Sequence, residues 1–110
     1  MTLNHIHLQV RDFEAVIDWI KNVWQAEPSF TDNRLAVFSF GAFTVILDRS
    51  DKDSPATLGF ESSDCDRDYA AVVKRGAVPV DPPANRPWGT RAAYLRGPGA
   101  VTFEIEQRLS

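Results

Sequence analysis

The chain has 110 residues, with 12 Lys and Arg against 15 Asp and Glu, so its net charge is −3 and its pI is near 5.2. This length fits one domain, and the acidic balance gives no electrostatic footprint for nucleic acid or anionic lipid. No stretch is apolar for long enough to span a membrane. The only cysteine, Cys65, excludes an internal disulfide, and the N-terminus lacks a signal-peptide layout. We therefore expect a cytoplasmic protein whose partner is a small molecule or a second copy of the chain.

The first half of the chain predicts a strand, a helix and two further strands. Residues 3–10 alternate between apolar and polar side chains, which is typical of a half-buried strand. Asp12 can then cap a helix whose apolar positions run at helical spacing as far as Trp24. Residues 34–40 and 43–49 predict strands joined at Gly41, and residues 51–55 form a polar linker.

The second half predicts the same order of elements. A strand at 57–62 is followed by a helix that Ser63 or Asp64 can cap and that Gly76 can end. Residues 78–80 predict a short strand, which Pro79 places at a sheet edge, and the proline-rich residues 81–89 predict a loop. Residues 90–95 and 100–106 predict the last two strands.

The two halves also resemble each other in sequence. Residues 41–47 read Gly-Ala-Phe-Thr-Val-Ile-Leu and residues 99–105 read Gly-Ala-Val-Thr-Phe-Glu-Ile, and each segment closes its half. The chain therefore contains two copies of one β-α-β-β-β module, the second longer by about six residues, and ligands of such proteins bind where the copies meet.

This order, the opening His-Ile-His-Leu-Gln-Val-Arg-Asp at 5–12 and the closing strand at 99–107 resemble the vicinal oxygen chelate superfamily, which includes glyoxalase I, extradiol dioxygenases, and fosfomycin and bleomycin resistance proteins. The resemblance implies an α+β fold in which two tandem modules, about 1–50 and about 56–110, form curved mixed sheets around a shared cleft. The whole of 1–110 is then one glyoxalase/bleomycin-resistance-like domain. It also implies a homodimer, and leaves open whether modules pair within one chain or between two.

The resemblance also implies where a metal is held. The family's ligand positions fall on His5, Ile46, Thr57 and Glu104, of which Ile46 cannot bind a metal and Thr57 stands where many members have histidine. His5 and Glu104 are therefore the candidate metal ligands and the candidate catalytic residues. With this broken set, the expected cofactor is none or a weakly held divalent metal.

His7 offers an alternative, because it lies two residues from His5 on the same strand face. His5, His7 and Glu104 would compose two imidazoles and a carboxylate, a set suited to iron, manganese or zinc. The interpretation that we favour is that His7 is a polar residue that lines a cleft or hydrogen-bonds across strands, and we place it among the ligand-binding candidates.

The remaining ligand-binding candidates are aromatic or charged. Flat rings offer stacking to planar or cationic compounds, and Phe38 and Phe40 have an equal claim to be core residues. Arg86 and Arg91 could answer a ligand carboxylate or phosphate. The candidates in addition to His7 are Phe38, Phe40, Glu61, Trp88, Arg91 and Tyr94.

Three functions follow. The sequence favours a protein similar to bleomycin resistance proteins, an antibiotic-resistance type of activity in which an apolar, aromatic or cationic compound is bound in a dimer cleft. The alternative is a metal-dependent lyase, isomerase, dioxygenase or thiol transferase that uses His5 and Glu104, with Glu106 or Glu61 as a base. The third is a relative without chemistry that acts as an interaction partner.

Overall fold

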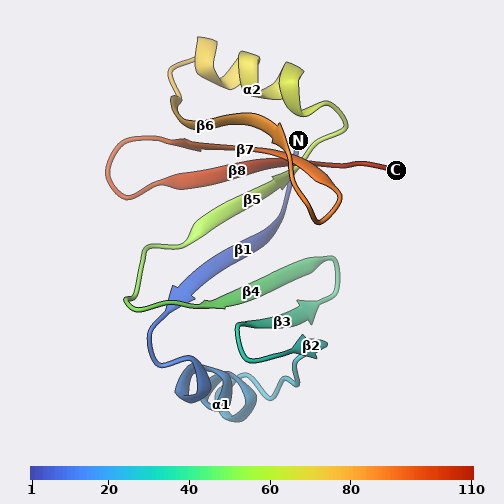
Figure 1. The fold of residues 1–110 in the computed structure, drawn as a ribbon. Coiled ribbons are helices and arrows are strands. Elements are labelled where there is room, and N and C mark those ends of the chain that lie inside the picture. Colours follow the sequence, from blue (N-terminus) through green and yellow to red (C-terminus); the bar gives the residue numbers. More distant parts are fainter. The chain divides into compact units, whose positions relative to one another are not determined.

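A computed structural model describes all 110 residues, with two helices and eight strands. The chain divides into two compact units, His5–Ala56 on the one hand and Met1–Asn4 with Thr57–Ser110 on the other. Each unit contains the helix and the last three strands of one β-α-β-β-β module, together with most or all of its first strand. This confirms the predicted α+β class and the repeated module order (Figure 1).

The first module contains β1 (Thr2–Val10), α1 (Phe13–Val23), β2 (Phe30–Thr31), β3 (Leu35–Phe40) and β4 (Phe43–Arg49). Its strands are hydrogen-bonded in the order β2-β3-β4-β1, with β1 parallel to β4 and the other pairs antiparallel. Because side chains alternate along a strand, those on one face of the sheet pack against α1 and form a core with the helix residues Phe13 and Ile20. The side chains on the other face do not take part in this core.

The second module contains β5 (Thr57–Glu61), α2 (Cys65–Lys74), β6 (Val78–Asn85), β7 (Thr90–Arg96) and β8 (Thr102–Arg108). The strand order is β5-β8-β7-β6, with β5 parallel to β8. Cys65 from α2 packs with Ala93, Leu95 and Ile105 from the sheet, so the helix again covers one face only.

The ends of the two helices differ. The Asp64 side chain accepts a hydrogen bond from the backbone N–H of Arg67, as predicted, whereas Asp12 precedes α1 but makes no side-chain cap bond. The Asp12 backbone carbonyl instead accepts from the N–H of Val16 at 2.9 Å. Gly76 ends α2 at φ +117°, and the N–H groups of Gly76 and Ala77 bond the carbonyls of Val73 and Val72, which is a Schellman motif.

Residues 81–89 depart from the predicted loop. β6 continues to Asn85, and only Arg86–Gly89 form a turn. β6 lies at one end of the strand order, where prolines remove no hydrogen bond from a second neighbour. Register shifts between Pro79 and Asp81 and between Asp81 and Ala84 absorb the irregular geometry.

Neither helix is long and apolar enough to cross a membrane.

Candidate functional site

His5 and His7 point to the same face of β1 because they lie two residues apart on a strand. Their ring centroids are 5.0 Å apart, with the planes nearly perpendicular. His5 is buried, with 6% of its surface exposed, whereas the His7 side chain keeps 26%. Two imidazoles therefore stand side by side, one enclosed and one accessible.

His7 is oriented by a carboxylate from the neighbouring parallel strand. Its Nδ1 lies 3.4 Å from Oδ2 of Asp48 on β4. A proton on Nδ1 facing Asp48 leaves the lone pair on Nε2, which is the arrangement of a metal-binding histidine held by an outer carboxylate.

Glu104 comes from the middle of β8 and is almost fully enclosed, with 2% of its surface exposed. Tyr94 lies opposite Glu104 in the β7–β8 register, and its hydroxyl donates to Oε2 at 2.8 Å. Burial, and next the negative charge of Glu104, raise the pKa of the Tyr94 phenol above its ordinary value. The phenol therefore stays protonated and remains a donor to the carboxylate at neutral pH.

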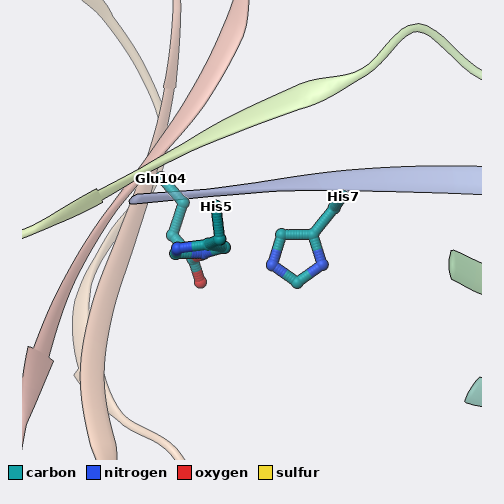
Figure 2. A group of neighbouring side chains, drawn as sticks. All are labelled: His5, His7 and Glu104. Carbon is teal, nitrogen blue, oxygen red and sulfur yellow. The ribbon is translucent and has the colours of Figure 1, made fainter. Parts of the chain in front are cut away.

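The nearest donor atoms of His5, His7 and Glu104 all lie within 4.8 Å of one another (Figure 2). Two imidazole nitrogens and one carboxylate oxygen form a donor set that suits zinc, iron or manganese. The residues present thus fit a divalent metal with a modest contraction of the group, since metal–ligand bonds are near 2.0–2.2 Å.

The other two residues at the family's ligand positions, Thr57 and Ile46, add no donor atom to this group. The Thr57 hydroxyl is 3.2 Å from the hydroxyl of Thr102, so the two threonines pair with each other. Ile46, on β4 opposite His7, offers no ligand atom. In the group that could hold a metal, His7 stands with His5 and Glu104 as the third residue with a donor atom, the set that the sequence raised as an alternative.

Solved structures share this fold at low sequence identity. Methylmalonyl-CoA epimerase from Streptomyces coelicolor, in complex with 2-nitronate-propionyl-CoA, matches with a TM-score of 0.76 and 17% identity over 100% of this chain and 99% of that one. The Mycobacterium tuberculosis epimerase gives 0.74 and 15% over 99% and 89%, and a Legionella pneumophila structure described as NAD-dependent benzaldehyde dehydrogenase gives 0.77 and 15% over 96% and 98%. The chain has the vicinal oxygen chelate fold. No family model and no curated protein matches the sequence.

Within this vicinal oxygen chelate fold, Phe38 and Phe40 point away from the histidine face. Phe38 pairs with Val45 in the β3–β4 register and is fully buried in the core beneath α1. Phe40 shares that face and packs against Trp24, with ring centroids 5.9 Å apart. Phe38 is thus a core residue, whereas Phe40 keeps 39% of its surface exposed beside Trp24.

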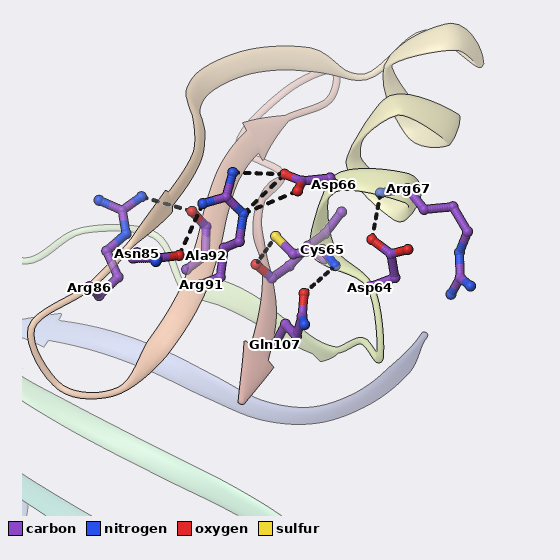
Figure 3. A network of polar contacts seen from close by, with 10 residues as sticks. Asp64, Cys65, Asp66, Arg67, Asn85, Arg86, Arg91, Ala92 and Gln107 are labelled. Atoms are coloured by element: carbon purple, nitrogen blue, oxygen red, sulfur yellow. Dashed lines mark hydrogen bonds and ion pairs between the residues drawn. The ribbon is translucent and has the colours of Figure 1, made fainter. Parts of the chain in front are cut away.

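The three other polar or aromatic candidates lie at or near strand ends or in a turn. Trp88 lies in the turn after β6 with 65% of its surface exposed. Glu61, at the end of β5, accepts from the amide of Asn4 at 3.1 Å. Arg91 turns to α2, where its guanidinium pairs with Asp66 at 3.0 Å and donates to Asn85 (Figure 3). Of the ligand-binding candidates, Tyr94 donates to the Glu104 carboxylate, and His7 belongs to the group of three residues that could hold a metal.

No sequence pattern indicates Asp48 as the partner of His7. The parallel register pairs Gln9 with Asp48 and His7 with Ile46, so Asp48 is a diagonal neighbour of His7 on the same face. Strand phase alone places both residues on that face, but the parallel register was needed to bring them together.

Proposed function

We propose that this chain is a divalent-metal-dependent enzyme of the isomerase or epimerase type, acting on a small substrate with a carbonyl next to an acidic C–H. The observation that carries the proposal is the convergence of His5, His7 and Glu104 within 4.8 Å. The complexes of the structurally similar epimerases with acyl-CoA compounds make acyl thioesters the first substrate class to test.

His5, His7 and Glu104 would hold the metal in this proposal. The chemistry that such a cation supplies when bound is Lewis acidity, which stabilises negative charge on a substrate oxygen. Tyr94 holds the Glu104 carboxylate through its hydroxyl, and Asp48 holds the His7 ring. These outer contacts keep the donor atoms oriented and therefore lower the cost of assembling the site.

Glu106 is the best-placed proton acceptor. It follows Glu104 by two residues on β8 and so projects from the same face of the strand. A carboxylate beside the substrate can remove the acidic proton as a general base. The resulting carboxylic acid returns the proton to the neighbouring carbon in an isomerisation, whereas water supplies a proton to the opposite face in an epimerisation.

The test is proton exchange at the acidic carbon. Metal-loaded protein is incubated in deuterium oxide with methylmalonyl-CoA, other acyl-CoA thioesters and 2-oxo acids, and deuterium uptake is followed by proton NMR. We expect uptake with at least one of these substrates, its loss in Glu106→Gln, and its retention in Glu27→Gln, whose side chain is 80% exposed. Metal-loaded protein that exchanges no proton with any of them would refute the proposed reaction.

A metal-free binding protein is the second candidate, supported by the Thr57–Thr102 pair at a family ligand position. In that case the cluster is a polar site, and the exposed Trp88 offers the stacking surface for an aromatic or cationic compound. Tryptophan fluorescence of the wild type and of Trp88→Phe during titration with such compounds tests it, and a response that Trp88→Phe retains would contradict the role of Trp88.

The homodimer also remains a proposal. Sedimentation equilibrium at micromolar concentration decides between a 12.3 kDa particle and one of twice that mass.

A further inference from the structure

Arg86 is a half-buried cation whose hydrogen bonds are concentrated on one nitrogen. Nη2 donates to Oδ2 of Asp81 at 3.1 Å and to the carbonyl oxygen of Ala92 at 2.9 Å (Figure 3 shows the contact with Ala92). Nε is buried and has no partner, and Nη1 makes no hydrogen bond within the protein. Three of the five N–H groups of the guanidinium are therefore unpaired.

Such a group is costly in an enclosed position. Only 18% of the Arg86 side chain is exposed, whereas its one ion-pair partner, Asp81, is 50% exposed and partly screened by water. Buried charges are normally paired and fully hydrogen-bonded, because desolvation penalises them heavily. Nε is closed off from solvent, so an acceptor would have to approach the two unpaired N–H groups of Nη1, for which the protein itself provides no partner.

The turn after β6 fixes Arg86 in place. The backbone N–H of Arg86 donates to the Thr90 carbonyl at 2.7 Å, and the N–H of Gly89 donates to the Arg86 carbonyl at 3.1 Å. Gly89 takes φ +94°, which closes this turn and which other residues rarely adopt. Backbone hydrogen bonds therefore fix the start of the Arg86 side chain at this hairpin end.

Arg86 also lies next to the candidate site. Its guanidinium carbon is 5.4 Å from the centroid of the Tyr94 ring, and the hydroxyl of the same tyrosine donates to Glu104. One tyrosine side chain thus connects the cation to the buried carboxylate.

We propose that Arg86 binds the carboxylate of a small organic acid, so that the substrate carries a carboxylate in addition to its reacting carbonyl. This inference deepens the proposed function and rests on it for the position of the reacting end. Carboxylate oxygens are the acceptors that unpaired guanidinium N–H groups bind most strongly. Asp81 competes for the same cation and weakens the site.

The experiment follows the Arg86 side-chain Nε–H resonance in proton–nitrogen NMR spectra during titration with succinate. Succinamide is the uncharged control, and sodium chloride at equal ionic strength controls for screening. We expect a saturable shift with succinate alone. We also expect binding at least about 10-fold weaker in Arg86→Gln, followed through the Tyr94 and Ala92 backbone resonances, and unchanged in the exposed control Arg75→Gln.

Asp81→Asn keeps the test decisive even if Arg86→Gln folds poorly. Removing the competing charge while keeping an acceptor for Nη2 should tighten succinate binding by about threefold to tenfold. If Arg86 serves only to connect β6 to β7, its resonance should show no saturable shift with succinate, or the same shift with succinamide or chloride. Asp81→Asn should then leave the affinity for succinate unchanged. Any of these results overturns the inference.

Metal uptake measured on the same samples separates the two proposals. If succinate binds at Arg86 in protein that takes up no metal, the anion site is supported and the proposal of a metal-dependent enzyme is refuted. If the protein takes up metal but the Arg86 resonance does not shift with succinate, only the proposal of the anion site is refuted.

Discussion

The Tyr94 hydroxyl donates a 2.8 Å hydrogen bond to Oε2 of Glu104, so the buried carboxylate has one oxygen already engaged by a neutral donor. This contact joins the middle of β7 to the middle of β8. It orients Glu104 without neutralising it, which is the role expected of a group that supports a metal ligand.

Replacing Tyr94 by Phe removes only this donor. We expect the affinity for Co²⁺ to fall by about 10-fold or more, because outer contacts of metal ligands typically contribute 10- to 100-fold. Competition against a chromophoric chelator measures the affinity. Tyr69→Phe on α2 is the matched control and should leave it unchanged; an equal loss in both variants would show that the Tyr94 contact has no specific role.

Asp48→Asn tests the orientation of His7. The substitution removes the carboxylate 3.4 Å from Nδ1 and with it the preference for a free Nε2. We expect Co²⁺ affinity to fall by about 10-fold, and Asp51→Asn in the exposed segment after β4 to have no effect. Unchanged affinity in Asp48→Asn would mean that His7 is oriented by other contacts.

Cys65 should be chemically inert in the folded protein. Its thiol is fully buried, donates to the Ile105 carbonyl at 3.4 Å, and burial raises its pKa to about 11. Reaction with Ellman's reagent at pH 8 should be undetectable without denaturant and complete in urea. Rapid reaction of the native protein would contradict this burial.

The same shift makes folding stability depend on pH. Because the folded pKa lies above the unfolded value, the contribution of Cys65 is fully present below the unfolded pKa and is lost as pH rises through about 11. Urea unfolding of the wild type and of Cys65→Ala between pH 8 and 11 should show a steeper loss of stability in the wild type.

Gly76→Ala should destabilise the second unit. Gly76 adopts φ +117° at the end of α2, where an alanine is strained even though its Cβ would meet no atom within 4 Å. We expect a loss of about 1–2 kcal/mol, or about 4–8 °C in Tm. Gly97→Ala, whose Cβ would meet Val101 at an ordinary 3.7 Å, is the control, and an equal loss there would argue against backbone strain as the cause.

The order of strands and helices was predictable because the periodicities are clear. The alternation of residues 3–10 predicts β1, and the turn at Gly41 predicts the end of β3. A short edge strand at 78–80 was predicted, but the prolines of residues 81–89 led us to expect a loop where β6 continues to Asn85. Pairing at a sheet edge depends on where a strand lies in the sheet and not only on its composition.

The three residues of the candidate site were predictable, but the side chains that orient them were not. The spacing of His5 and His7 placed both on one face of a strand, and the family resemblance indicated Glu104. The contact of Asp48 with His7 depends on the register of β1 and β4. The position from which Arg86 makes its hydrogen bonds, both through Nη2, depends on the turn after β6. Neither leaves a periodic signal in the sequence.

Metal content is the most direct test of the metal-binding cluster. Protein purified without a histidine tag or chelator, and then incubated with zinc, manganese, iron or cobalt and desalted, is analysed by mass spectrometry. We predict about one metal per chain, lost in His5→Ala, His7→Ala and Glu104→Ala and retained in Thr57→Ala. Wild-type protein that stays empty with all four metals, or a metal that survives loss of His7, would contradict the assignment of His5, His7 and Glu104 as the metal ligands.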